Sequence, residues 1–371
     1  MNQLQILVQL LAAAVADPAK TSLFAQSNIN STVKDPFVGL MPRVTGASYG
    51  FEASSLNMVV TPLLPVAMNS PFPNVGAVAP DTWKGETDKY AGEIPVDEPT
   101  MRQVQDTLLR LGGQGNNTLG TQTAQGFIQR LLSNLRDAAD LAEKIARAEA
   151  IMTGKYVGKA AIFGMKGAKL IGKADYKVNR ITAATAHDQA GSTFWADLDA
   201  GERKLLGTVQ RRYISENTFV KVKNQAANGI IETGRRVQND DGTYTVTISR
   251  LAKKADGSFD TLSQNFDAQY RDVEFTVVKT QEFQVPGADG KLVKLSFGSD
   301  GTIALIGAAR VGQLYVAPTV EGAFKGVALD RYAYLAQPRD WEIAARCVEN
   351  FVPVVEDNRN VTIIETGVTF S

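Results

Sequence analysis

The stretch TAQGFIQRLLSNLRDAADLAEKIARAEAIMTGKY, residues 123–156, is the clearest periodic segment of the chain. Its apolar side chains recur every three or four residues, which is the spacing of one face of an α-helix. At ~1.5 Å per residue, about 30 residues form a rod roughly 45 Å long, which is more than a compact domain requires. The pattern therefore predicts a strut-like helix over residues 122–153. Its candidate core residues are Phe127, Leu131, Leu135, Ile145 and Met152.

The remaining face of this predicted helix is charged, and its acidic residues lie beside bases. Asp140 and Lys144 stand four residues apart, as do Glu143 and Arg147. Such pairs stabilise a helix face that is exposed to solvent, so we expect this side to be solvated. Gly154 is the predicted end of the helix. The segment contains no His or Cys, and this favours a structural role over a catalytic one.

The composition of the 371-residue chain argues against most classes of enzyme. A single histidine, His187, and a single cysteine, Cys347, leave little room for metal sites or for nucleophile–base pairs. The 39 basic residues equal the 39 acidic ones, so the overall field does not attract polyanions, and no basic stripe is present. Catalysis by carboxylate, Lys or Tyr side chains is not excluded by this composition. We expect no enzymatic activity, no cofactor and no metal.

The first residues, MNQLQILVQLLAAAVADPAK, are apolar from Ile6 to Ala16. No Lys or Arg precedes Ile6, so the positive end of a secretory signal is missing. We interpret this segment as a short amphipathic helix that ends at Asp17 and Pro18. No apolar run approaches the ~20 residues that a membrane span needs. We therefore expect a protein that is made in the cytoplasm and does not enter a membrane.

Proline is concentrated in the first part of the chain, where ten of the fourteen lie before residue 100. This density opposes helices and central strands, yet the segment is too apolar for a disordered linker. An extended apolar arm is best explained if it wraps a partner. Because aromatic residues are enriched in buried interface centres, we predict that Trp83 and Tyr90 contact an adjacent subunit. The alternative is that they fold back on their own chain.

The chain beyond the long helix mixes helices with strands. Residues 156–178 have the pattern of a glycine-interrupted hairpin, and residues 190–234 read as helical. Asp-Gly turn signals then separate short alternating segments. The predicted strands are YTVTISRL, RDVEFTVVKTQEFQV, KLVKLSF, GTIALIG and NRNVTIIETGV. Helices that are segregated from turn-linked strands indicate the α+β class.

Two short motifs invite a catalytic interpretation. Gly167 to Lys173 satisfies the G-x-x-x-x-G-K spacing of a phosphate-binding loop, but Ala174 stands where Ser or Thr is needed, and a strand follows. We read these glycines as easing a hairpin, with a nucleotide-dependent enzyme as the alternative. His187 lies beside Asp188 and near Ser192, but adjacency says nothing about the geometry of a triad. We interpret it as a surface histidine.

The order of these parts resembles the lambda-type major capsid protein family of tailed phages, whose fold is of the Hong Kong 97 type. The similarity begins at IMTGKY, residues 151–156, which a hairpin follows. It continues through the strand-rich run at residues 269–322 and the step Val352–Pro353 before a closing strand. The resemblance covers residues 40–371. It departs from the family pattern over residues 209–233, where no clear aliphatic strand precedes the helix.

This resemblance implies a major capsid protein that assembles into the hexamers and pentamers of an icosahedral head around double-stranded DNA. Its partners would be further copies of itself, portal, scaffold and decoration proteins, and DNA without sequence-specific contacts. The implied parts are an N-terminal arm (1–42), an extended loop (43–100), a peripheral domain with the spine helix (101–190), an axial domain (191–330) and return strands (331–371). An encapsulin-like nanocompartment shell is the alternative with the same fold. Lys84 and Lys89 match no crosslinking role, and we predict no crosslink.

Overall fold

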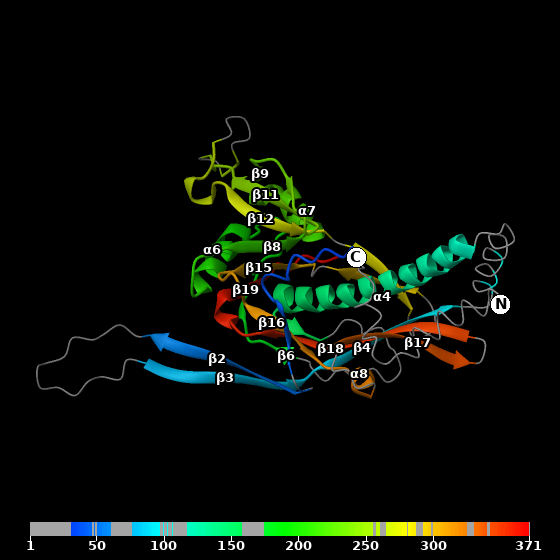
Figure 1. Ribbon diagram of the computed structural model, residues 1–371. Helices are drawn as coiled ribbons and strands as arrows, with labels where there is room; N and C mark the ends of the chain where they lie inside the picture. The colour runs from blue at the N-terminus through cyan, green and yellow to red at the C-terminus, as the bar shows by residue number, and fades with distance from the viewer. Residues whose placement is uncertain are drawn as a thin grey trace, which may run out of the picture.

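The protein is described by a computed structural model, shown as a ribbon in Figure 1. The residues that it describes are 31–46, 48, 50–60, 76–96, 99, 102, 106, 117–157, 174–254, 257–259, 265–279, 281–286, 292–297, 300–324, 330–339 and 342–370. The helices within these ranges are α4 (Asn117–Thr153), α6 (Phe194–Lys204), α7 (Glu216–Asn224) and α8 (Val320–Phe324).

The first sheet lies beside the long helix α4 (Figure 1). Its strand order is β1-β16-β18-β17, and β4 also pairs with β18. The strands are β1 (Arg43–Thr45), β4 (Asp88–Val96), β16 (Gly312–Ala317), β17 (Arg331–Arg339) and β18 (Glu342–Val355). Strand β18 pairs antiparallel with β16, β17 and β4, whereas β1 runs parallel to β16. Strand β18 is therefore the strand around which this sheet is built, since it pairs with three of the other four strands.

The second sheet stands above the first and carries α6 and α7 (Figure 1). Its order is β10-β11-β12-β8-β15-β19-β7, and β9 also pairs with β11. The strands are β7 (Asn179–Thr182), β8 (Arg211–Ser215), β9 (Ile230–Glu232), β10 (Val237–Gln238), β11 (Thr243–Arg250), β12 (Val273–Val278), β15 (Thr302–Ile306) and β19 (Val361–Glu365). Phe194 and Trp195 of α6 and Phe219 of α7 are buried in its core.

Three two-stranded ribbons complete the described chain, and in that part of the chain they pair with no other strand. They are β2 (Gly50–Val60) with β3 (Gly76–Glu86), β5 (Lys155–Tyr156) with β6 (Ala174–Asp175), and β13 (Gln281–Pro286) with β14 (Leu292–Phe297). The β2–β3 hairpin runs outward, away from both sheets (Figure 1).

The strands predicted from alternating sequence are confirmed. YTVTISRL matches β11 to within one residue at each end, and KLVKLSF, GTIALIG and NRNVTIIETGV contain β14, β15 and β19. RDVEFTVVKTQEFQV divides into β12 and most of β13. Each segment alternates in side-chain character or is bounded by turn residues, and those are local signals. The α+β class follows from these sheets and helices.

The prediction that residues 190–234 are helical throughout is wrong. Strand β8 separates α6 from α7 and lies between β12 and β15 in the second sheet. Tyr213 and Ile214 are buried there, so contacts with distant strands decide the conformation of a segment too short to show a period. Ser215 ends the strand and caps α7, because its side chain accepts a hydrogen bond from the Thr218 N–H. Strand β8 therefore precedes helix α7 at the place where the sequence showed no clear aliphatic strand.

The long helix α4 is the predicted strut, although it begins at Asn117 instead of residue 122. It ends at Thr153, directly before the predicted stop Gly154, where φ is +63° and a Cβ atom would lie 2.2 Å from the Val178 side chain. Only glycine adopts this left-handed conformation without strain or collision. No helix that the structure describes combines the length and apolar character needed to cross a membrane. The amphipathic helix expected near residues 6–16 lies outside the described residues.

Candidate functional site

The junction between α4 and the first sheet is the candidate site, because it buries both apolar and charged side chains of the helix. Of the predicted core residues, Leu135 and Met152 are buried, and Ile145 is partly buried against the core. Leu131 is half-exposed, and the side chain of Phe127 lies outside the described residues. The stripe is thus most deeply buried toward the carboxyl end of the helix, where both sheets approach it.

Four charged residues at this junction form a closed set, which we call the arginine–glutamate ring: Arg43 of β1, Glu143 of α4, Arg331 of β17 and Glu349 of β18. Arg43 lies 3.1 Å from the Glu143 carboxylate and 2.8 Å from that of Glu349. Arg331 donates to the same two carboxylates, at 2.8 Å and 3.1 Å. Each arginine therefore bridges both glutamates, and the ring ties three strands to the helix.

Further ion pairs extend the ring along α4. Arg147 donates to Glu143 at 2.9 Å and to Asp35 at 2.7 Å, and its Nε donates to the Met41 carbonyl oxygen at 3.0 Å. Arg331 also donates to Asp140 of α4 at 2.6 Å. The segment before β1 is therefore held against the helix by charge-assisted hydrogen bonds.

The two glutamates of the ring differ in their ionisation. Burial opposes ionisation of Glu143, but its contact with Glu349 and the charges of Arg43, Arg331 and Arg147 lower its pKa to about 2. Burial and the neighbouring Glu143 raise the pKa of Glu349 above its ordinary value. Proximity of two carboxylates separates their pKa values, while the shared arginines keep both within one network.

The expectation that Glu143 and Arg147 lie on a solvated face is wrong. The two side chains do pair, but both are buried, as is Lys144. Their ion-pair partners Arg43, Arg331 and Asp35 come from distant parts of the chain, and sequence reasoning missed them. A usable signal was present for Glu349, which lies within the apolar strand CVENFVPVV at residues 347–355. A charge in such surroundings needs a buried partner.

Tyr90 lies on β4 and packs within its own chain. Its ring stacks on Phe351 of β18 with centroids 4.0 Å apart and planes 5° apart, and its hydroxyl contacts that of Tyr156. Burial raises the pKa of Tyr90 above its ordinary value. Tyr90 therefore packs against the core of its own chain, which was the alternative interpretation, and its contact with an adjacent subunit stays a prediction. Trp83 belongs to β3, and its side chain lies outside the described residues.

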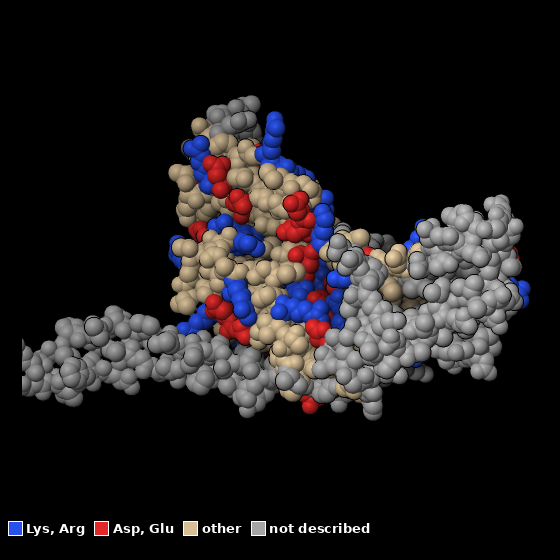
Figure 2. Space-filling model, viewed as in Figure 1, with Lys and Arg blue, Asp and Glu red and all other residues tan. Residues whose placement is uncertain are grey.

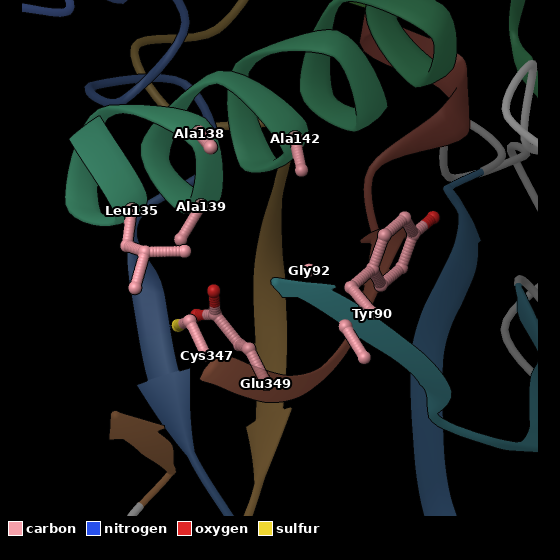
Figure 3. A pocket seen from close by; sticks show the side chains of 9 residues that line it. Tyr90, Gly92, Leu135, Ala138, Ala139, Ala142, Cys347 and Glu349 are labelled. Carbon is pink, nitrogen blue, oxygen red and sulfur yellow. The ribbon is translucent and has the colours of Figure 1, made fainter. Parts of the chain in front are cut away.

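A small cavity of about 130 Å³ lies between α4, β4 and β18. Figure 3 shows Leu135, Ala139 and Ala142 of α4 above Cys347 and Glu349 of β18, with Tyr90 of β4 alongside. Its walls are mostly apolar, and burial raises the pKa of the Cys347 thiol to about 12. A thiol with so high a pKa is a poor nucleophile.

The two motifs with a catalytic interpretation gain no support from the described residues. His187 is fully buried and not at the surface as predicted; its Nε2 lies 2.9 Å from Asp197 Oδ2, and its ring meets Phe194 edge-on. Gly167 to Lys173 lies outside the described residues. Within the described part of the chain, no group of His, Cys, Asp and Glu side chains is arranged to hold a metal ion.

The described surface in Figure 2 carries basic and acidic side chains interspersed over the second sheet and its helices, without a stripe of one sign. This distribution agrees with the equal numbers of acidic and basic residues in the chain. The charged residues that connect different elements are instead those of the arginine–glutamate ring, which join α4 to strands β1, β17 and β18.

No protein-family model matches the sequence, and no curated protein matches it. Several solved structures, however, match the fold of this chain. A protein described as the capsid protein of a prophage of E. coli CFT073 is 11% identical, with 98% of this chain and 99% of that chain covered and a TM-score of 0.50. The capsid of a native GTA particle is 12% identical over 92% and 94%, with a TM-score of 0.47. A structure of Mycobacterium phage Adephagia is 11% identical over 94% and 95%, with a TM-score of 0.41.

The first of these likenesses spans almost the whole of both chains and shows the fold. The chain has the α+β, Hong Kong 97-like fold that its sequence resemblance predicts.

Proposed function

We propose that this chain, which has the Hong Kong 97-like fold, is the major capsid protein of a tailed phage. It assembles into the hexamers and pentamers of an icosahedral head that encloses double-stranded DNA. The observation that carries the proposal is the likeness to a prophage capsid protein over nearly the full length of both chains. Low sequence identity limits that likeness to the fold, so assembly itself must be tested.

This proposal assigns each part of the chain a role in the capsid subunit. The β2–β3 hairpin is the extended loop within residues 43–100, and α4 is the spine helix of a peripheral domain at 101–190. Strands β8 to β12 and β15 of the second sheet, with α6 and α7, belong to an axial domain at 191–330, and β17, β18 and β19 are return strands at 331–371. Residues 1–42 are an N-terminal arm. Trp83 of the hairpin contacts an adjacent subunit.

The arginine–glutamate ring supports a structural role for the junction. A shell closes only if each subunit presents its contact surfaces at fixed angles, and many individually weak contacts then act together. The ring fixes α4 against strands β1, β17 and β18 by ion pairs with directional geometry. Buried ion pairs add little net stability, but a wrong arrangement would leave charges unpaired. The ring therefore specifies how the helix crosses the sheet.

The remaining parts of the proposal concern partners and location. The protein is a structural component of the virion without catalytic activity or cofactor, and it is made in the host cytoplasm. Its partners are copies of itself, and portal, scaffold and decoration proteins. The balanced charge of 39 basic and 39 acidic residues suits a shell that encloses DNA without adhering strongly to phosphate.

Negative-stain electron microscopy of the purified chain tests the proposal. We expect closed shells of uniform diameter, or capsomers that close when a scaffold protein is added. Calorimetric titration with ATP on the same sample tests the nucleotide-dependent alternative at Gly167 to Lys173. A monomer that binds ATP saturably and forms no shell with or without scaffold would refute the assembly proposal. Shells that copurify with a host enzyme inside would point to the encapsulin-like alternative.

A further inference from the structure

Glu349 of β18 is the more deeply buried of the two glutamates in the arginine–glutamate ring. Only 1% of the residue is exposed, and its carboxyl group points toward α4 at the wall of the mostly apolar cavity, beside Leu135 and Cys347 (Figure 3). Water therefore solvates this carboxyl group poorly. A negative charge on it has to be compensated by protein groups, or the group stays protonated.

The two arginines beside Glu349 compensate it only in part. Arg43 Nη2 lies 2.8 Å from Glu349 Oε1, but among the described residues neither atom is aligned for a hydrogen bond. Arg331 donates to Glu349 from Nε at 3.1 Å, whereas its contacts with Asp140 and Glu143 are shorter, at 2.6 Å and 2.8 Å. Arg331 is therefore engaged more closely by two other acids than by Glu349.

The network of ion pairs around the ring holds more carboxyl groups than arginines. Among the described residues, the ion pairs that connect to the ring join five carboxyl groups with four arginines. The excess persists when the partly exposed members Asp330 and Arg136 are left out. Lys144 acts on Asp35 too, but it also lies beside another carboxylate, Asp241. The carboxyl groups of the network are those of Asp35, Asp140, Glu143, Asp330 and Glu349, and the arginines are Arg43, Arg136, Arg147 and Arg331.

The two glutamates are also in contact with each other. The carboxyl groups of Glu143 and Glu349 lie within hydrogen-bonding reach of one another. Ionised carboxylates have only acceptor oxygens, so a hydrogen bond between the two groups needs a proton on one of them. Burial, followed by the contact with Glu143, raises the pKa of Glu349 above its ordinary value. Position, charge balance and contact therefore all favour a proton at this pair.

We propose that Glu143 and Glu349 hold one proton between them at neutral pH, and that this proton latches α4 to β18. The protonated pair joins helix and strand by a carboxyl–carboxylate hydrogen bond and carries a single negative charge. Loss of the proton sets two negative charges against each other in a buried site, so the latch weakens as the pH rises. This proposal goes beyond shell formation and does not depend on it, since every contributing residue belongs to one chain.

The surroundings of the pair come from five elements, and each contributes a charged or titratable group. These groups are Arg43 of β1, Tyr90 of β4, Asp140 and Arg147 of α4, Arg331 of β17 with Asp330 directly before it, and Cys347 of β18. The cations among them oppose the latch, because they favour the doubly ionised pair, whereas the acids favour the shared proton.

Infrared spectroscopy of the unassembled full chain in D2O tests for the proton, because the carbonyl band of a protonated carboxyl group lies apart from the bands of carboxylates. We expect this band at neutral pH in the unmodified chain and a loss of intensity in Glu349→Gln. Glu143→Gln should lose it as well, because without a negative neighbour Glu349 ionises beside the arginines. Difference spectra remove the background of Asp35, whose pKa is also raised by burial. The control Glu93→Gln removes an exposed carboxyl group paired with Arg346 and should leave the band unchanged.

Thermal unfolding of the same unassembled chains tests the latch. The unfolded chain releases the proton of Glu349 near pH 4.5, whereas the folded pair keeps it to a higher pH. The folded state therefore binds more protons within this window, so its stability declines as the pH rises through it. We expect the midpoint of the unmodified chain to fall relative to that of Glu349→Gln between about pH 5 and about pH 9, since glutamine stays neutral throughout.

The sign of this difference decides between the proposal and an ordinary ion pair. A midpoint that rises with pH relative to Glu349→Gln, or a constant difference, would overturn the proposal, because a carboxylate stabilised by arginines gives that result. Absence of the infrared band at neutral pH in the unmodified chain, or a band that both ring variants retain, would overturn it too. The unmodified chain supplies this test even if Glu349→Gln does not fold. A failure to form shells would concern the proposed function alone, because both measurements use unassembled chains.

Discussion

Glu143 and Glu349 share the same two arginine side chains, so each guanidinium neutralises charge on two elements at once. Such sharing makes the pairs interdependent. Removing both charges of a buried pair can be neutral, whereas removing one partner leaves the other buried without compensation. Single substitutions in the ring should therefore cost more than equivalent substitutions in exposed pairs.

Arg331→Met tests this at the residue scale, because it removes one of the two arginines that Glu143 and Glu349 share, together with an ion-pair partner of Asp140. We expect the free energy of unfolding, measured by urea denaturation of the unassembled chain, to fall by about 3–5 kcal/mol. The matched control is Arg346→Met on β18, whose ion pair with Glu93 is largely exposed. That change should cost less than about 1 kcal/mol. Equal effects of the two substitutions would contradict a special role for the ring.

His187 makes the stability depend on pH in a defined direction. Burial lowers its pKa in the folded chain, whereas the unfolded chain binds a proton near pH 6.5. The unfolded state then takes up more protons as the pH falls, so the stabilisation is complete above about pH 6.5 and declines below it. We expect the thermal midpoint to fall more steeply between pH 7 and pH 5 in the natural chain than in His187→Gln. Parallel pH profiles would show that the histidine does not contribute.

At the scale of elements, α4 combines a buried apolar stripe with buried charges on the same helix. Leu135 is 2% exposed and faces the cavity beside β18, so Leu135→Asp would place a carboxylate in apolar surroundings. Burying an unpaired charge is costly enough to prevent folding. We expect insoluble or unfolded Leu135→Asp protein by circular dichroism. Asn134→Asp adds the same charge at the adjacent exposed position and should fold normally.

Two glycines of the same region should respond oppositely to alanine. At Gly154, φ is +63° and the added Cβ would lie 2.2 Å from Val178, so Gly154→Ala should destabilise the fold by about 1–3 kcal/mol. Gly126 lies inside α4 with no atom within 4 Å of the position of a Cβ, so Gly126→Ala should stabilise it by about 0.5–1 kcal/mol. Urea denaturation measures both. Effects of the same sign would show that the end of the helix is not held as described.

The elements that could be predicted from sequence are those whose signal is local. The strut has many turns of one period, and β11 and β15 lie between turn residues. Strand β8 could not be predicted, because its five residues acquire their conformation from β12 and β15. The arginine–glutamate ring could not be predicted either, because Arg331 and Glu143 are 188 positions apart in the sequence. Tyr90 lay in a Pro-rich segment that showed no sign of its pairing with β18.

At the scale of the whole molecule, the β2–β3 hairpin separates folding from assembly. Its strands pair only with each other among the described strands, whereas Tyr90 and the rest of β4 belong to the first sheet. Replacing residues 52–84 by a short Gly-Ser linker should therefore leave both sheets intact. On the proposed function, it should abolish shell formation, because each subunit would lose its extended loop. Circular dichroism and size-exclusion chromatography report both properties. Intact shells, or an unfolded chain, would contradict the prediction.

The central position of β18 in the first sheet also fixes the order of events during synthesis. Strands β4, β16 and β17 all pair with β18, and α4 contacts it, yet residues 342–355 leave the ribosome after every one of these partners. The second sheet likewise waits for β19 to join β15 and β7. Pairings between segments so distant in sequence form slowly. A partly made chain therefore cannot complete either sheet, and on the proposed function nascent chains on neighbouring ribosomes would not present finished contact surfaces to one another.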